Sequence, residues 1–276
     1  MTSMINEKIS CSTKQLYLRY ALFLFLIAMF SPAFGTPSSQ NSEANRTLHL
    51  ASTSWCPYIC DNKDKPGFIV EYLTNSLADR GIHLAISILP WSRAIYMAQT
   101  GALDGLATAT TVEAPDFFLT RVATGSYQMC FFSRATDNFS YNGRKSLANK
   151  TIGAVKDYGY GEPIDSMILQ PKEQERIELL ATSNPLYSLM GMLETSRIDL
   201  FIEDAAVVQT FLYTHPNKHS IQKAGCLNQV PFYTAISPTH KKGKQLAEEL
   251  SIILSSDAAR DHYSDARKRY GLEEKE

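Results

Sequence analysis

The sequence predicts an α/β fold built from two similar halves. The first observation is a strand–helix–strand unit over residues 82–111, in which a helix starts at Pro90 and a turn at Asp104 leads into a β-prone run. The second observation is a repeat of this unit, because Pro185 and Asp199 follow Pro90 and Asp104 after about 95 positions. Strands that alternate with helices pair in parallel, so each half should be a mainly parallel sheet with flanking helices.

Apolar periodicity places the other elements of the first half. Alternating apolar residues indicate strands, and apolar residues at helical spacing indicate a helix that a glycine can end. In chain order we expect a strand at Leu48–Ser52, a polar loop over 53–66, a helix from Phe68 to Gly81, a strand at Ile82–Ile88, the Pro90 helix and a strand at Leu106–Thr111.

The second half begins and ends with segments that we interpret as crossings between the halves. The first is the β-rich run Tyr127–Arg134 and the return is Phe232–Ser237. Between and after them we expect strands at Thr151–Val155, Ile177–Leu180 and Ile198–Ile202, helices at Pro185–Glu194 and from Asp204 to about Tyr213, and closing helices at Lys242–Leu254 and Asp257–Tyr270.

The N-terminal segment is typical of a secretory signal. A basic start precedes the apolar run Ala21–Phe30, which is too short to span a bilayer comfortably, and Ala33–Gly35 offers small residues for cleavage. We therefore expect residues 1–35 to be a signal peptide cleaved near Gly35, residues 36–45 to be a linker, and the mature protein to be periplasmic. An uncleaved membrane anchor is the alternative.

The charge balance and the length of the chain limit the classes of function that the protein can have. The chain has 27 Lys and Arg against 28 Asp and Glu, and the part after the leader carries about −3. This balance gives no indication of nucleic-acid binding, which usually needs a basic patch. The remaining roughly 240 residues can form two lobes with separate cores. We expect lobe 1 to comprise residues 46–130 and 233–276, and lobe 2 to comprise residues 131–232.

The cysteines agree with export. Cys11 belongs to the leader, and an even number remains, as expected in an oxidising compartment: Cys56, Cys60, Cys130 and Cys226. Four cysteines allow three pairings, which the residues alone leave open, although Cys56 and Cys60 share one short loop. A metal site built from this pair and His49 is a weaker alternative, so we expect no metal.

The central unit carries a family resemblance. Pro90-Trp-x-Arg-Ala94, a helix and then Gly101-x-x-Asp-Gly105 resemble the bacterial extracellular solute-binding proteins of family 3, the amino-acid-type receptors of ABC importers. The resemblance extends over essentially the whole chain after the leader, through Ser54–Tyr58, Pro66–Phe68, Thr108–Thr111, Ile152–Val155 and Ile198–Asp204.

This resemblance implies a two-lobed periplasmic-binding-protein fold, with the lobes joined by two crossover strands and able to hinge. It implies a monomer without a cofactor that closes over a small polar solute and delivers it to the membrane permease of an ABC importer, as in amino-acid transport. It also favours the pairing Cys130–Cys226, since both segments would lie close to the crossover, which leaves Cys56 to pair with Cys60.

Candidate ligand-binding residues cluster where strands end, the usual ligand position in such sheets. Aromatic faces can stack on a planar or aliphatic ligand or hold a cation, and core packing is their alternative role. A cation in the first turn of a helix, such as Arg93, needs a compensating acid or ligand carboxylate. The candidates are Trp55, Tyr58, Trp91, Arg93, Thr108, Thr110, Tyr158 and Asp204.

The resemblance assigns roles to some of these residues and leaves one role open. Thr108 and Thr110 match the loop that holds the carboxylate of amino-acid ligands, and Asp204 matches the acid that binds the amine, although it also suits a helix N-cap. The family's clamp arginine is replaced by Asp116, which puts an ordinary α-amino acid ligand in doubt.

Two other function classes stay open from the sequence. An enzyme on the same scaffold, similar to cyclohexadienyl dehydratase, would need a buried acid, which Glu113, Asp157, Glu203 or Asp204 could supply; no proton-transfer pair is recognisable, so we expect no catalysis. A periplasmic sensory or accessory module is the other alternative.

Overall fold

The computed structural model describes residues 46–215 and 220–272. The predicted signal peptide and linker lie outside the described residues. Within these residues, none of the helices combines the length and the apolar character needed to cross a bilayer.

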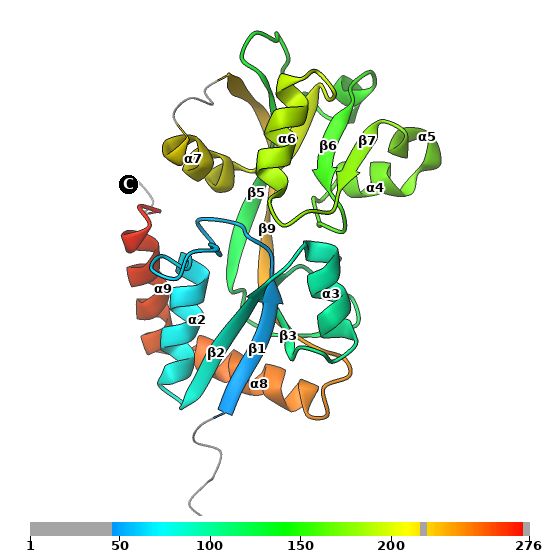
Figure 1. Cartoon of the computed structure of the whole chain (residues 1–276). Coiled ribbons are helices and arrows are strands. Elements are labelled where there is room, and N and C mark those ends of the chain that lie inside the picture. The colour runs from blue at the N-terminus through cyan, green and yellow to red at the C-terminus, as the bar shows by residue number, and fades with distance from the viewer. Residues whose placement is uncertain (1–45, 216–219, 273–276) are drawn as a thin grey trace, which may run out of the picture. The chain divides into compact units, whose positions relative to one another are not determined.

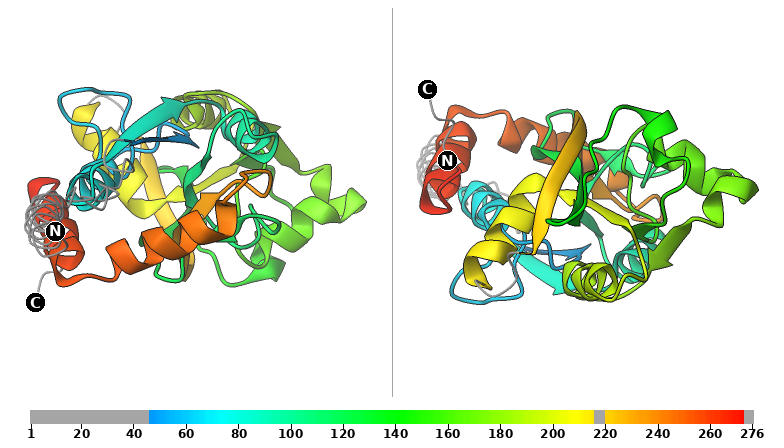
Figure 2. Two further views of the ribbon diagram at one scale, coloured as in Figure 1. Left: turned by 90° about the horizontal axis from the view of Figure 1, so that it is seen from below. Right: turned by 90° about the horizontal axis from the view of Figure 1, so that it is seen from above.

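Lobe 1 is a sheet with helices packed against it. Strand β1 pairs in parallel with β2 and β3, while β3 and β4 pair antiparallel with the long strand β9. Helix α9 packs along α2 (Figure 1), and Figure 2 shows α8 running across this lobe in the view from below. The elements are β1 (Arg46–Ser52), α2 (Phe68–Ala78), β2 (Ile82–Ile88), α3 (Trp91–Gln99), β3 (Gly105–Ala109), β4 (Phe118–Leu119), β9 (Ile221–Ile236), α8 (Gly243–Leu254) and α9 (Asp257–Arg269).

Lobe 2 is built around the parallel strands β6, β7 and β8, with β8 antiparallel to β5. Helix α6 packs on this sheet through buried residues that include Leu189 and Leu193. The elements are β5 (Gly125–Arg134), η1 (Arg144–Leu147), β6 (Ile152–Val155), α4 (Ile164–Leu169), α5 (Pro171–Gln174), β7 (Ile177–Leu180), α6 (Pro185–Glu194), β8 (Leu200–Asp204) and α7 (Ala205–Thr214).

Strands β5 and β9 connect the two lobes (Figure 1), and the strand order is β2-β1-β3-β9-β5-β8-β6-β7. The predicted return crossing at Phe232–Ser237 covers only the last part of β9, which starts at Ile221. The first part was missed because its polar residues break the apolar alternation and because Pro231 lacks a ladder donor. The strand nevertheless continues through Pro231, which lies opposite Ser126 of β5.

The aspartates of the two repeated units make equivalent pairs of hydrogen bonds in the structure. In lobe 1 the backbone N–H of His49 donates to Asp104 Oδ2 at 2.8 Å, and the N–H of Asp104 donates to the His49 carbonyl at 2.8 Å. In lobe 2 Thr151 and Asp199 make the equivalent pair of hydrogen bonds, at 2.9 and 2.8 Å. Each aspartate therefore fastens the turn after its helix to the neighbouring strand, which confirms the predicted repeat.

Most other predicted elements match closely, with two shifts near the end of a strand. Strand β3 ends at Ala109 rather than Thr111, because the N–H of Thr110 turns to bond a side chain instead of the ladder. Strand β8 spans Leu200–Asp204 rather than Ile198–Ile202, so Glu203 and Asp204 are its last residues.

Both favoured disulfides are present, Cys56–Cys60 and Cys130–Cys226. The second cross-links β5 to β9, where Cys130 lies opposite Cys226. The first closes the loop after β1, in which Trp55 and Ile59 also form a backbone bridge.

We expect the disulfide between the crossing strands to stabilise the folded protein more than the disulfide in the loop after β1 does. It closes a segment of 96 residues, whereas the other closes one of 4. Loss of the longer one should lower the free energy of unfolding by about 2–4 kcal/mol, and loss of the shorter one by less. Denaturation of Cys130→Ala/Cys226→Ala and Cys56→Ala/Cys60→Ala variants measures both. Equal effects, or four free thiols in the denatured, leaderless protein, would contradict this expectation.

Candidate functional site

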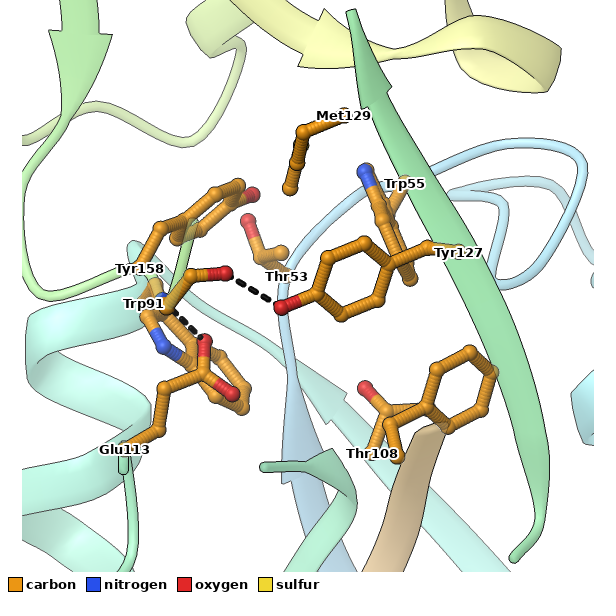
Figure 3. Close-up of a pocket in the computed structure, with 10 residues that line it drawn as sticks. Thr53, Trp55, Trp91, Thr108, Glu113, Tyr127, Met129 and Tyr158 are labelled. Carbon is orange, nitrogen blue, oxygen red and sulfur yellow. Dashed lines mark hydrogen bonds between the residues drawn. The ribbon is translucent and has the colours of Figure 1, made fainter. Parts of the chain in front are cut away.

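A small cavity lies between the lobes, at the ends of the parallel strands (Figure 3). Its volume is about 30 Å³, enough for one or two water molecules, so a larger solute can enter only when the lobes separate. Its walls are mainly aromatic, with hydroxyl groups and one carboxylate between the rings. The lining residues are Thr53, Trp55, Trp91, Thr108, Glu113, Tyr127, Met129, Tyr158, Gly159 and Phe232.

Glu113 is held in place by a capping box on the loop after β3. The Thr110 N–H donates to Glu113 Oε2 at 2.7 Å, and the Glu113 N–H donates to Thr110 Oγ1 at 3.2 Å. This reciprocal pair follows from the Thr-x-x-Glu spacing of the sequence. Burial raises the pKa of the Glu113 carboxyl, against the opposing effect of hydrogen bonds from Gly159 and Thr110.

Gly159 fastens the loop after β6 onto lobe 1. Its N–H donates to Glu113 Oε1 at 3.0 Å, and its carbonyl accepts from the Tyr127 hydroxyl (Figure 3). A side chain could not fit here easily, because a Cβ on Gly159 would lie 2.8 Å from Thr110 Oγ1 and 3.3 Å from Glu113 Cγ. The glycine therefore permits the close approach of the two lobes at the cavity.

Trp55 makes a second bridge between the lobes. Its ring stacks on Tyr58 with centroids 4.3 Å apart, and its Nε1 donates to Glu203 Oε1 at 3.0 Å. Glu203 is 1% exposed, and its other oxygen, Oε2, has no hydrogen-bond partner. Burial raises the pKa of Glu203 to about 7, although hydrogen bonds from Trp55 and the Asp204 backbone oppose the shift.

Asp204 caps α7, as predicted. Its Oδ1 accepts from the N–H groups of Ala206 and Val207 at 2.9 and 3.1 Å, while Oδ2 accepts from Gln128 at 2.9 Å. Burial raises its pKa, and these hydrogen bonds oppose that shift. The carboxylate thus joins β5 to α7 and has most of its acceptor capacity filled by backbone.

Asp204→Asn should therefore destabilise the fold as well as remove a charge. An asparagine can keep its oxygen on Ala206 and Val207, but its amide then points a donor at the donor of Gln128. We expect the free energy of unfolding to fall by about 1–3 kcal/mol, and urea denaturation measures it. Serine at the same position keeps the cap alone and is the matched control. A variant as stable as the parent would mean that the Gln128 contact contributes nothing.

The structure brings half of the sequence candidates into the cavity and places the others outside it. Trp55, Trp91, Thr108 and Tyr158 line it. Tyr58 packs behind Trp55 and donates its hydroxyl to the Ser126 carbonyl at 3.3 Å, Thr110 positions Glu113, Asp204 caps α7, and Arg93 is exposed on α3.

Several lining residues were not among the sequence candidates for ligand binding. Tyr127, Met129 and Phe232 come from the crossing strands, and alternation along β5 directs Tyr127 and Met129 to the same side. The Thr-x-x-Glu capping box was the signal that could have located Glu113. Nothing in the sequence marks Thr53 or Gly159, because they reach the cavity only through the tertiary arrangement.

No protein-family model and no curated protein matches this sequence. Solved structures do match. An ancestral arginine-binding protein bound to glutamine gives a TM-score of 0.67 at 14% identity, covering 82% of this chain and 98% of that one. A histidine kinase sensor domain with similarity to periplasmic binding proteins gives a TM-score of 0.69 at 13% identity, covering 82% and 96%.

A substrate-binding protein of an ABC uptake transporter from Streptococcus pneumoniae, with bound histidine, gives a TM-score of 0.67 at 14% identity, covering 82% of this chain and 93% of that one. The chain has the periplasmic-binding-protein fold. This result confirms the predicted two-lobed α/β architecture. By name, these neighbours are two binding proteins and one sensor domain, and at such identities the likeness concerns the fold alone.

Proposed function

We propose that the protein is a periplasmic solute-binding protein of the family 3 type, which closes over a small polar, amine-bearing solute and delivers it to an ABC importer. The observation that carries the proposal is the aromatic cavity at the ends of the parallel strands, bridged by hydrogen bonds from both lobes. Ligands of doubly wound sheets bind at this position, and aromatic rings between lobes suit a solute enclosed on all sides.

The bridging contacts explain how a solute could control closure. Glu113 and Trp55 of lobe 1 contact Gly159 and Glu203 of lobe 2, and Tyr127 of the connecting strand β5 also contacts Gly159. A solute that touches both lobes adds contacts to the closed form alone, so it shifts the balance towards closure. The neighbours bound to glutamine and histidine are consistent with this use of the fold.

Native mass spectrometry of the protein purified gently from its host tests the proposal. We expect a small-molecule adduct that disappears after unfolding and refolding, and that returns when the small-molecule extract of the host is added back. The Trp91→Ala variant should fail to retain it, while Tyr96→Ala, an exposed substitution on the same helix, should retain it. Absence of any adduct with both the purified protein and the extract would contradict the proposal.

A further inference from the structure

Glu113 is the carboxylate in the cavity lining, and Glu203 and Asp204 lie behind that lining, where Glu203 accepts from Trp55. Glu203 and Asp204 are each 1% exposed, and the Glu113 carboxylate is enclosed between Thr110 and Gly159. No ion pair formed within residues 46–215 and 220–272 reaches any of these three acids. A buried carboxylate without a cation is unfavourable, so a cation bound beside Glu113 would stabilise the charged form of that carboxyl.

Several polar atoms in the cavity wall lack a well-formed hydrogen bond and can turn to a ligand. The Nε1 of Trp91 lies near the Glu113 carboxyl and the Oγ1 of Thr53 near the Tyr158 hydroxyl, but neither contact has the geometry of a hydrogen bond, and Trp91 and Thr53 are only 3% and 5% exposed. The hydroxyl of Tyr158 is enclosed in the same way. Figure 3 shows Trp91 beside Glu113, and Tyr158 beside Thr53, with no hydrogen bond drawn within either pair.

The ring faces add a favourable environment for a cation. Trp55, Trp91, Tyr127, Tyr158 and Phe232 line the cavity together. An ammonium group over an aromatic face is attracted by the ring electrons, and most strongly where water is excluded. Glu113 lies among these rings (Figure 3) and is the lining residue whose side chain can carry a negative charge.

A carboxylate, in contrast, finds no counter-charge in the cavity. Arg93 is exposed on α3, and Asp116 lies exposed on the loop that carries Glu113. None of the lining residues is a lysine, arginine or histidine. A ligand carboxylate would therefore be desolvated beside Glu113, and like charges brought together in this way repel each other strongly.

We propose that the solute is an organic amine that lacks a carboxylate, and that Glu113 is the group that pairs with its ammonium. This proposal rests on the solute-binding function and names the ligand class of the same cavity. Glu113 keeps its backbone donors from Thr110 and Gly159, and each carboxylate oxygen has a further lone pair available for the ammonium. Glu113 thus selects the cation and, through Gly159, joins ligand binding to lobe closure.

Matched pairs of amines and amino acids test the proposal, because the members of each pair differ only by a carboxylate. Calorimetry should compare ethanolamine with serine, putrescine with ornithine, agmatine with arginine, and tyramine with tyrosine. In at least one pair the amine should bind about tenfold or more tighter than its amino acid. Glu113→Gln should lower that amine's affinity by about tenfold or more, whereas Asp116→Asn, an equal charge change on the same loop, should change it less than about twofold.

The possible results distinguish a failure of this ligand assignment from a failure of the proposed solute-binding function. Amino acids that bind as tightly as their amines, no binding by any amine, or an affinity unchanged by Glu113→Gln would overturn the assignment. If the host's small-molecule extract still raises the melting temperature in that case, the solute-binding function stands. If neither the amines nor the extract has an effect, both fail. A fall in affinity for both members of a pair alike in Glu113→Gln would show that Glu113 acts only on closure, which also overturns the assignment.

Discussion

Trp55→Ala is expected to lower the free energy of unfolding by about 3–5 kcal/mol, the usual loss for a buried large aromatic side chain. Trp55 is 7% exposed and packs against Tyr58, Tyr127 and Phe232, with centroids 4.3, 5.6 and 6.0 Å away. The variant also removes the donor of Glu203, which leaves that buried carboxyl with one partner fewer. Urea denaturation at pH 7 measures the loss.

Trp55→Phe is the matched control, because it keeps most of the ring packing and removes only the N–H. We expect it to cost about 1–3 kcal/mol, the effect of an unsatisfied buried acceptor. Two variants with the same loss would mean that the hydrogen bond to Glu203 accounts for the whole effect. A loss below about 1 kcal/mol in Trp55→Ala would contradict the packing described for this residue.

Glu203 should make the protein more stable in mild acid than in mild base. Burial raises its pKa from an ordinary 4.5 to about 7, so between these values the folded protein binds a proton that the unfolded chain releases. Its contribution is therefore complete below pH 4.5 and is lost as the pH rises through 7. The difference amounts to about 3 kcal/mol at most.

Glu203→Gln should remove this dependence, since its amide does not titrate. Relative to the parent, the variant should be more stable at pH 8 by about 3 kcal/mol and about equally stable at pH 5. Glu175→Gln, an exposed substitution in lobe 2, controls for the charge change. The neighbouring acids Glu113 and Asp204 are present in both proteins, so the comparison isolates Glu203. Parallel curves of stability against pH would show that Glu203 keeps an ordinary pKa.

Local patterns predicted most of the fold. Helix α6 and strands β2 and β7 have the expected bounds, because strong periodicity and proline at the helix start determine them. The start of β9 was missed, since its residues are specified by pairing with β5 and not by their own alternation. Pairing partners far apart in the chain leave little local signal.

The candidate site was predictable only in part, for the same reason. Their positions near the ends of predicted strands were enough to select four residues of the cavity wall, because loops at the carboxyl ends of parallel strands converge. These residues are Trp55, Trp91, Thr108 and Tyr158. Arg93 lies two residues after the inward-facing Trp91, about 200° around the helix, and faces solvent in this structure, so its position near a strand end did not bring it to the cavity. Glu113 is held in the cavity wall partly by a hydrogen bond from Gly159 of the other lobe, and no local sequence pattern predicts this contact.

Small-angle scattering of the leaderless protein with and without its solute tests the central claim most directly. We expect the lobes to separate to admit the solute and to close over it with the contacts of Glu113, Gly159, Trp55 and Glu203. A saturating solute, identified from the native mass spectrum, should reduce the radius of gyration and bring the curve to that calculated from this structure. An identical curve with and without the bound solute would contradict closure, and with it the proposed solute-binding mechanism.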